Sequence, residues 1–261
     1  MPVANWRNLV LVIAYNDMNK LITILALLIL TSCNKDSTWE DINAPDKQVE
    51  VMLDVPPFKK IRINSGFTLE IVQDTLQEVS ILSRENLIPN IAWYLEDGTL
   101  FFEDNNKLKW LRSHYSTTIK VRTDVLERID NYGSGSLIIS PDTLRFPQLV
   151  VNSKSHSSIF DLKVNNIIFN VVCNDITTFK VSGKANSMDI YFAASDGRFE
   201  GNQFMVNDIT VKHNGTNDMI FYPLHSLIGE LQNTGDILFQ HVPDSLAVSI
   251  LGRGQLINRS N

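Results

Sequence analysis

The fold can be read from residues 190–199, Ile190-Tyr191-Phe192-Ala193-Ala194-Ser195-Asp196-Gly197-Arg198-Phe199. An alternating apolar run ends at Phe192, small polar residues follow, and Phe199 begins a second apolar run. Alternation with a period of two is typical of a β-strand, and Ser, Asp and Gly in succession indicate a tight turn. The same pattern recurs over residues 209–219, so these residues predict a repeated strand–turn–strand unit.

This unit recurs throughout residues 126–261. The first strands of the units are carried by Ile129, Leu149/Val151, Phe169/Val171, Ile190/Phe192, Ile209/Val211, Leu231 and Val248/Ile250. The apolar residues that restart the chain after each turn are Leu137, Ile159, Phe179, Phe199, Met219, Ile237 and Leu256. Successive restart residues are 22, 20, 20, 20, 18 and 19 positions apart, which indicates a structural repeat of about 20 residues.

A parallel β-solenoid explains this spacing, because each coil climbs one strand spacing of ~4.8 Å and stacks equivalent side chains above one another. We therefore predict an all-β fold, a parallel β-helix or solenoid with coils of about 20 residues. A β-sandwich is the alternative, since it also consists of short strands joined by frequent turns. The packing of a sandwich, however, does not require one 20-residue register to be kept over seven units.

Residues 56–125 are also β in character but less regular, and we expect them to form the N-terminal part of the solenoid. Alternation is visible at Ile61-Arg62-Ile63 and Thr118-Ile119-Lys120-Val121. Asp97-Gly98 precedes Thr99-Leu100-Phe101-Phe102, and this pattern predicts a hairpin turn between two strands.

The N-terminal residues 1–32 have the features of a secretory signal peptide. Leu21 to Leu30 is an apolar run preceded by Lys20, and it is too short for a transmembrane helix, which needs ~20 apolar residues. Its end resembles a lipobox, Leu30-Thr31-Ser32-Cys33, which implies acylation of the Cys33 thiol and cleavage before it.

Met18-Asn19-Lys20 resembles a complete signal-peptide start, so we predict that translation begins at Met18. Residues 33–55 are polar and non-periodic, and we predict a flexible tether behind the lipidated Cys33.

The sequence resembles the putative auto-transporter adhesin, head-GIN domain family, over residues 56 to 257. The resemblance rests on these motifs: Phe58-x-x-Ile61 followed by Gly66-Phe67, Asn86-Leu87 before Gly98-Thr99-Leu100, the recurring Ser/Gly turns, Leu227…Thr234-Gly235-Asp236-Ile237, and Gly252-Arg253-Gly254. It departs from the family's turn glycines at His156-Ser157, Asn174-Asp175 and Asn217-Asp218. The resemblance implies a right-handed β-helical fold on a lipoprotein or secreted chain of Bacteroidota, and it implies no catalytic residues.

Composition and motifs give little sign of chemistry. The formal charge is −6 and the basic residues are scattered, so we expect no nucleic-acid partner. The only cysteines are Cys33 and Cys173, which excludes a disulfide framework, and we expect Cys173 to be a buried small residue. The histidines show no metal-ligand spacing, and no nucleophile or nucleotide motif is present, so we expect no cofactor.

Two groups of charged residues are candidate sites. Asp175, Asp196, Asp218 and Asp236 lie near successive turns, where they could bind Ca²⁺ or could simply be good turn residues. Parallel β-helices also include polysaccharide lyases and glycosidases, for which the candidate residues are Asp189, Arg198, Glu200 and Lys212. A groove with a converged cluster of such residues would support the enzyme hypothesis.

We therefore predict an outer-membrane lipoprotein, at the cell surface or the periplasmic face, that is a non-catalytic binding, adhesion or scaffold module. Its membrane contact is the lipid anchor, and its partner is a glycan or an envelope protein. Exposed aromatics would mark a glycan site, and the candidates are Trp39, Trp93, Tyr94, Trp110, Tyr115, Tyr191 and Tyr222. A self-associating component joined through solenoid ends is a further alternative, which exposed apolar residues at an end would favour.

Four tripeptides resemble the O-glycosylation acceptor of Bacteroidota. They are Asp36-Ser37-Thr38, Asp74-Thr75-Leu76, Asp142-Thr143-Leu144 and Asp244-Ser245-Leu246. The resemblance implies sugars on Ser37, Thr75, Thr143 and Ser245, each of which would need an exposed hydroxyl.

Overall fold

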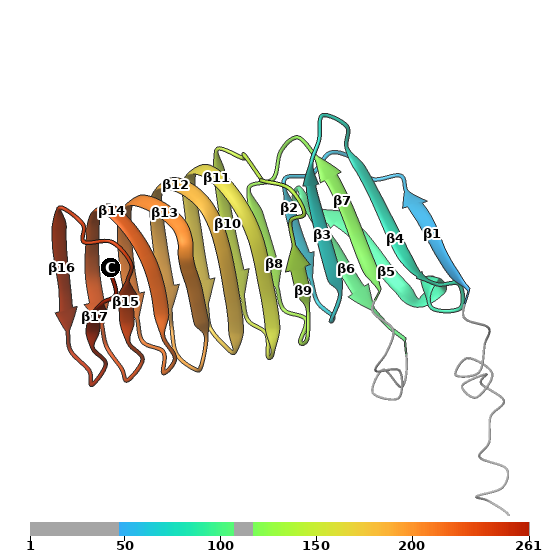
Figure 1. Ribbon diagram of the computed structural model, residues 1–261. Helices are drawn as coiled ribbons and strands as arrows, with labels where there is room; N and C mark the ends of the chain where they lie inside the picture. The colour runs from blue at the N-terminus through green and yellow to red at the C-terminus, as the bar shows by residue number, and fades with distance from the viewer. Residues whose placement is uncertain (1–46, 107–116, 261) are drawn as a thin grey trace, which may run out of the picture. The chain divides into compact units, whose positions relative to one another are not determined.

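The structure is a computed structural model that describes residues 47–106 and 117–260. Strands follow one another along nearly all of this length (Figure 1). The predicted signal peptide of residues 1–32, the start at Met18, the lipidation of Cys33 and the glycan acceptor Ser37 lie outside the described residues. So do Trp39, Trp110 and Tyr115.

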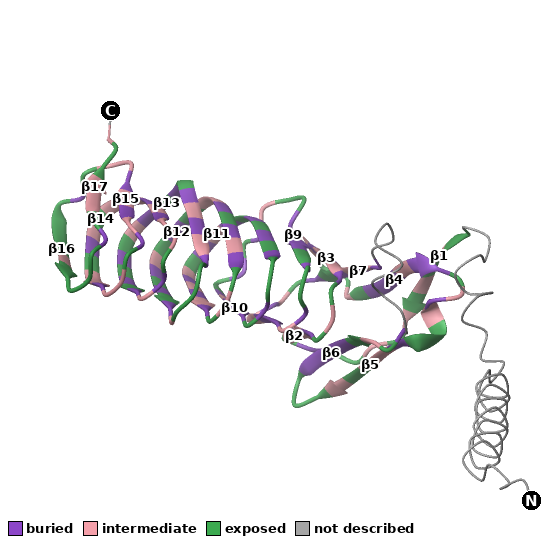
Figure 2. Ribbon diagram, turned by 90° about the horizontal axis from the view of Figure 1, so that it is seen from below, coloured by how far each residue is buried: buried purple, intermediate pink, exposed green. Residues whose placement is uncertain are grey.

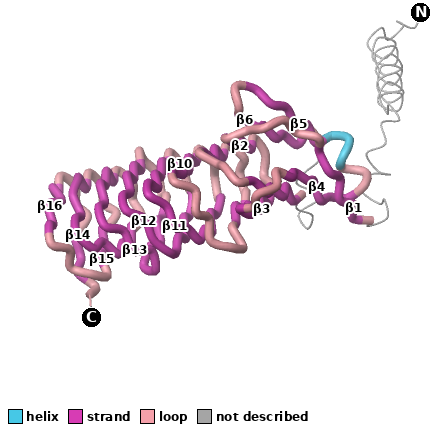
Figure 3. The backbone as a smooth tube through the Cα atoms, turned by 90° about the horizontal axis from the view of Figure 1, so that it is seen from above, coloured by secondary structure: helices cyan, strands magenta, loops and turns pink. Residues whose placement is uncertain are grey.

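The strands divide into an N-terminal group and a group of regular coils. The N-terminal strands are β1 (Gln48–Leu53), β2 (Lys60–Ile63), β3 (Thr68–Gln73), β4 (Glu78–Arg84), β5 (Ile91–Glu96), β6 (Thr99–Asp104) and β7 (Thr118–Thr123). The coil strands are β8 (Arg128–Asn131), β9 (Leu137–Ile139), β10 (Gln148–Ser153), β11 (Ser158–Cys173), β12 (Thr177–Phe192), β13 (Arg198–His213), β14 (Met219–Leu231), β15 (Ile237–Phe239), β16 (Ser245–Ile250) and β17 (Leu256–Asn258). Among the described residues the only helix is the single 3₁₀ turn η1 (Ile88–Asn90), drawn in cyan in Figure 3. That part of the chain therefore has no helix long and apolar enough to span a bilayer.

The strands form two walls, which we call wall A and wall B. Wall A consists, in spatial order, of β5, β6, β2, β8, β10, the C-terminal halves of β11 to β14, and β16. Wall B consists of β1, β4, β7, β3, β9, the N-terminal halves of β11 to β14, β15 and β17. Each long strand thus starts in wall B and ends in wall A, so that one strand and one turn complete a coil.

The inward side chains of wall B form one continuous apolar column. Its members, each paired in parallel with the next, are Ile138, Phe160, Phe179, Phe199, Met219 and Ile237. All are fully buried, and the rings of Phe160 and Phe179 stack with their centroids 4.9 Å apart. Parallel pairing in register confirms the predicted solenoid, which has about seven turns, and excludes the antiparallel β-sandwich.

The predicted register is wrong by one residue in the first two coils. Leu137 and Ile159 pair with each other as expected, but their side chains face outward and are 37% and 38% exposed. The inward residues are their neighbours Ile138 and Phe160. Two adjacent apolar residues satisfy an alternating pattern in either phase, so hydrophobicity alone did not determine which one faces the core.

Wall A has an equivalent column, which the sequence did predict. Ile129, Val151, Val171, Ile190 and Val211 pair in succession and are all buried. The resulting alternation of buried and exposed residues along each strand is visible in Figure 2.

The interior also contains a hydrogen-bonded group of polar side chains near the first turns. Asn131 Nδ2 donates to Ser155 Oγ at 2.8 Å, and Ser155 Oγ donates to Ser158 Oγ at 2.7 Å. The hydroxyls of Ser153 and Thr177 lie 2.8 Å apart. All of these residues are buried, and each has a partner, so the network joins adjacent coils without leaving an unpaired polar group.

The N-terminal strands extend both walls. β2 pairs in parallel with β6 and β8, and β3 pairs in parallel with β7 and β9, whereas β1, β4 and β5 run antiparallel to their neighbours. The predicted hairpin is confirmed, since β5 and β6 are joined by Asp97 and Gly98 with φ of 48° and 69°.

The predicted tether of residues 33–55 extends too far toward the C-terminus. Residues Gln48–Leu53 form β1, which pairs with β4 along its whole length. Val49, Val51 and Leu53 alternate with more exposed residues there, which is the period of a strand rather than of a linker.

Candidate functional site

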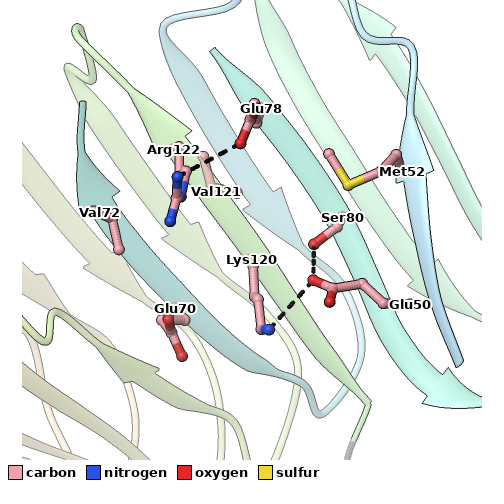
Figure 4. Close-up of a pocket in the computed structure, with 9 residues that line it drawn as sticks. All are labelled: Glu50, Met52, Glu70, Val72, Glu78, Ser80, Lys120, Val121 and Arg122. Atoms are coloured by element: carbon pink, nitrogen blue, oxygen red, sulfur yellow. Dashed lines mark hydrogen bonds and ion pairs between the residues drawn. The ribbon is translucent and has the colours of Figure 1, made fainter. Parts of the chain in front are cut away.

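The first candidate site is a charged hollow on the outward side of wall B, over β1, β4, β7 and β3 (Figure 4). Its volume is about 370 Å³, and its charged side chains are Glu50, Glu70, Glu78, Lys120 and Arg122. These residues alternate along their strands with buried ones such as Ile119 and Val121. The pairing of Ser80 and Glu70 with Lys120 brings opposite charges and hydroxyls side by side.

Two carboxylates of this hollow, Glu50 and Glu78, have neighbouring donors or cations. Glu50 Oε1 accepts a hydrogen bond from Ser80 Oγ at 2.7 Å and lies 3.2 Å from Lys120 Nζ. These two donors hold the pKa of Glu50 below its ordinary value. Arg122 Nη1 lies 3.7 Å from Glu78 Oε2 and 3.7 Å from an oxygen of Asp74. Glu50 therefore stays ionised, and the hollow offers the charged pairs Glu50–Lys120 and Glu78–Arg122, which can bind a polar ligand.

The second candidate site lies on the outward side of wall A, and we call it the aromatic row: Tyr94, Phe101, Arg62 and Tyr132. β5, β6 and β2 place Tyr94, Phe101 and Arg62 directly beside one another. The rings of Tyr94 and Phe101 are stacked at 4.6 Å, with 6° between their planes. The Arg62 guanidinium carbon lies 5.1 Å from the Phe101 ring centre and 4.9 Å from that of Tyr132, within cation–π range.

Asp130 fixes the polar side of this row. Arg128 Nε donates to both carboxylate oxygens of Asp130, at 3.0 and 2.9 Å, and Asn152 Nδ2 donates at 2.7 Å. Arg62 Nη2 lies 3.6 Å from the same carboxylate. Burial alone would raise the pKa of Asp130, but the hydrogen bonds from Arg128 and Asn152 outweigh it and lower the pKa below its ordinary value. Asp130 therefore stays ionised and holds the cationic groups in place.

The same line of side chains continues across wall A. Asp130 and Asn152 pair with each other, and beyond them Val172, Tyr191 and Lys212 are successive neighbours on β11, β12 and β13. Tyr191 is 40% exposed, and Lys212 Nζ lies 5.7 Å from the centre of its ring. One face of the solenoid thus carries an exposed tyrosine at two places along one line, Tyr94 and Tyr191, whereas Phe101 is buried between Tyr94 and Arg62.

The four residues predicted for an enzyme do not converge. Arg198 Nε donates to Glu200 Oε1 at 2.7 Å on wall B, whereas Asp189 and Lys212 are outward residues of wall A. Glu200 lines a second hollow on wall B, of about 360 Å³, together with Asp161, Lys163 and Lys180. A third hollow, of about 580 Å³, lies beside Phe58 and the Asp97–Gly98 turn. Lys59 and Glu127 line it, and Lys59 Nζ lies 2.9 Å from Glu127 Oε1.

The aspartates near the turns form turn hydrogen bonds. Asp218 Oδ1 accepts the backbone N–H of Asp236 at 3.2 Å, and Asp236 Oδ1 accepts that of Gln255 at 2.8 Å. Asp175 pairs with His156 at 2.9 Å. Asp196 accepts a hydrogen bond from a threonine of the next turn. Within residues 47–106 and 117–260 no three His, Cys, Asp or Glu side chains gather closely enough to hold a metal ion.

Two titratable residues belong to the core. Cys173 is fully buried, as predicted, and burial raises the pKa of its thiol to about 11. His213 is also fully buried and packs against the ring of Phe192. His213 Nδ1 accepts the Gly215 N–H at 3.2 Å, so Nε2 carries the proton and donates to Asn217 O at 2.8 Å. Burial lowers the pKa of His213, which is therefore neutral, and no motif in the sequence indicated this role.

The remaining predicted residues differ in exposure. Tyr94 is 45% exposed, whereas Trp93 packs against the core and Tyr222 stacks on His241 at 5.6 Å. Of the glycan acceptors, Thr75 and Ser245 are exposed and Thr143 is partly buried. The sequence did not reveal Arg62 as a site residue, although its position between Ile61 and Ile63 predicts an outward side chain.

The fold and these surfaces define a class: a β-solenoid with open polar and aromatic faces. The family model described as "Putative auto-transporter adhesin, head GIN domain" matches residues 57–243, and the chain belongs to this family. No curated protein sequence matches the chain.

Three solved structures share the fold. A putative adhesin from Bacteroides fragilis is 20% identical with a TM-score of 0.75, and the match covers 82% of this chain and 98% of that one. A putative adhesin from Parabacteroides distasonis is 14% identical with a TM-score of 0.59, covering 81% and 97% of the two chains. A protein from the same organism described as a putative lipid binding protein is 13% identical with a TM-score of 0.57, covering 81% and 96%.

Proposed function

We propose that this protein is a lipid-anchored, non-catalytic binding or adhesion module of the cell envelope, which holds an extended glycan along wall A. The observation that carries the proposal is the aromatic row, in which Tyr94, Phe101 and Arg62 lie side by side on neighbouring strands. Membership of an adhesin family supports a binding role at the cell surface or envelope.

The geometry of wall A suits an extended chain of sugars. Exposed tyrosine rings such as Tyr94 and Tyr191 can pack against the apolar faces of sugar rings, and Arg can bind a carboxylate or hydroxyls through its planar fork. Neighbouring strands are ~4.8 Å apart, so the outward side chains of successive strands follow one another at intervals close to the length of one sugar unit. Tyr191 and Lys212 lie on the same line, so a long ligand can contact two places on one face.

A glycan array probed with the full chain tests this proposal. We expect binding to one class of extended glycan, and we expect Tyr94→Ala to weaken it about tenfold, which corresponds to ~1.4 kcal/mol. Tyr222→Ala is the matched control, because Tyr222 stacks on His241 outside the row and its loss should leave affinity unchanged. Equal affinities for the Tyr94→Ala and unsubstituted chains would refute the aromatic row as the ligand site.

The anchor rests on the Cys33 lipobox. Two or three acyl chains on one cysteine hold a protein firmly to a membrane, whereas one chain holds it only marginally. The full chain produced in a bacterium should partition into detergent, with acyl mass on the peptide that starts at Cys33. Cys33→Ser should abolish both properties, and an unmodified Cys33 in the membrane fraction would exclude the anchor.

The enzyme alternative, a polysaccharide lyase or glycosidase, needs a carboxylic acid that remains protonated or a converged acid–base pair. In the described part of the chain, the carboxylates with shifted pKa values are Glu50 and Asp130, and both pKa values are lowered, which favours the ionised form. Any glycan found to bind should therefore be recovered intact after long incubation, and shorter products would favour the enzyme.

O-glycosylation of the exposed Thr75 and Ser245 also fits an extracytoplasmic protein. After the acyl groups on Cys33 are allowed for, the intact mass of the protein from its native source should exceed the mass of the chain that starts at Cys33 by whole sugar units. Loss of one such increment in Thr75→Val or Ser245→Ala would assign the site.

A further inference from the structure

The C-terminal end of the solenoid exposes side chains that belong to its interior. On β16, Leu246 and Ile250 continue the buried columns of Leu227 and Leu231, yet they are 41% and 50% exposed. Within the described residues no further coil covers them. Single exposed apolar residues are common, but three inward positions of one strand, with Val248 between these two, form a contiguous apolar end.

The same end presents open backbone edges. β16 pairs with β14 and β17 pairs with β15, and no other described strand occupies their outer edges. Proteins usually protect such an edge with a charged residue, a proline or a bulge. β16 reads Ser-Leu-Ala-Val-Ser-Ile and has none of these. β1, which lies at the opposite end of the described coils in Figure 1, carries Glu50 in its centre.

We propose that β16 pairs in antiparallel fashion with β16 of a second copy of this chain, about a two-fold axis at Val248. Residues directly opposite each other in an antiparallel pair point to the same face of the sheet. The inward side chains of the two copies therefore lie on one face only if the two-fold axis passes through a residue rather than between two residues. Centring on Val248 places Leu246 of each copy opposite Ile250 of the other. Both exposed apolar ends are then covered in a single closed contact, as a two-fold interface requires.

The charges on either side of β16 favour this orientation. Asp244 precedes the strand and Arg253 follows it, and both are exposed. Antiparallel pairing brings Asp244 of each copy beside the turn that carries Arg253 of the other. Parallel pairing would instead set each charge beside its own equivalent, which is repulsive. The end is thus complementary to itself in backbone edge, apolar side chains and charge.

Cysteine cross-linking of the full chain tests the register. Val248 would face its own equivalent at a Cβ distance of ~5 Å, so Val248→Cys should give a covalent dimer that a reducing agent reverses. In the same register the two Leu246 residues lie four positions apart, or ~14 Å, and Leu246→Cys should stay monomeric. A mixture of Leu246→Cys and Ile250→Cys chains should cross-link again. The unsubstituted chain, with Cys33 and the buried Cys173, gives the background.

Sedimentation of the detergent-solubilised full chain tests the association without cross-links. We expect a concentration-dependent dimer, which Leu246→Lys weakens at least tenfold while the circular dichroism spectrum stays unchanged. Three results would overturn the proposal: a monomer at every concentration, equal cross-linking of Leu246→Cys and Val248→Cys, or a Val248→Cys product whose second component is a different protein.

Discussion

Replacing two neighbouring residues of β11 with alanine should give very different losses of stability. Phe160 is fully buried, and its ring stacks on Phe179 at 4.9 Å. Removal of a phenyl ring from a packed core costs ~3–5 kcal/mol, so Phe160→Ala should lower the free energy of unfolding by that amount. Ile159 faces outward and is 38% exposed. Ile159→Ala should therefore cost no more than ~1 kcal/mol, since an outward side chain leaves no cavity in the core.

Urea unfolding followed by circular dichroism measures this difference. With a slope of ~2 kcal/mol per molar urea, a loss of ~3 kcal/mol lowers the midpoint by ~1.5 M, whereas Ile159→Ala should shift it by ~0.5 M or less. Both substitutions lie in one coil, so they perturb the same unit of the repeat array and their midpoints are directly comparable. Equal shifts, or a larger shift for Ile159→Ala, would refute the register described for wall B.

Other substitutions probe the core and the polar contacts. Gly229→Ala should prevent the last coils from forming native structure in limited proteolysis, because a Cβ there would lie 1.8 Å from Val211 O and φ is +139°. The pKa of His213 is lowered on folding, so below about pH 6.5 the unfolded chain gains a proton before the folded chain does. The free energy of unfolding should therefore be highest above that pH and decline below it. His213→Leu should flatten that decline in unfolding measured from pH 7 to 5. Asp130→Asn should lower the free energy of unfolding by ~1–3 kcal/mol at pH 7, because Arg128 loses its ionised partner. The stability of the unsubstituted chain should approach that of the variant as the pH falls below the ordinary pKa of an aspartate, since the pKa of Asp130 is lowered on folding. With its pKa at about 11, native Cys173 should resist thiol reagents at pH 8 and react only after unfolding.

The coil repeat could be predicted from the sequence because positions stacked in successive coils of the core must all be apolar. In wall B the four restart residues Phe179, Phe199, Met219 and Ile237 were found from spacing alone, since a polar residue in that column would be unpaired in the core. The phase was wrong at Leu137 and Ile159, where two apolar residues are adjacent. The strand at Gln48–Leu53 was missed because its pairing with β4 is a contact between distant residues.

The candidate sites were less predictable than the fold. Tyr94 was identified as an aromatic of interest, but its stacking on Phe101 and Arg62 depends on which strands become neighbours. β6 and β8 both pair with β2, although β6 follows β2 only after many intervening residues. The two turn serines with positive φ, Ser157 and Ser195, show that the coil tolerates residues other than glycine at positions where a left-handed backbone is needed.

Hydrogen exchange in the presence of a bound glycan tests whether wall A is the binding face, because it locates the ligand on the full chain without a substitution. We expect slower exchange of the amides in β5, β6 and β2, which carry Tyr94, Phe101 and Arg62 of the aromatic row, and unchanged exchange in β15 and β17 of wall B. Protection confined to wall B, or no protection by any glycan that binds, would contradict the assignment of wall A as the binding face.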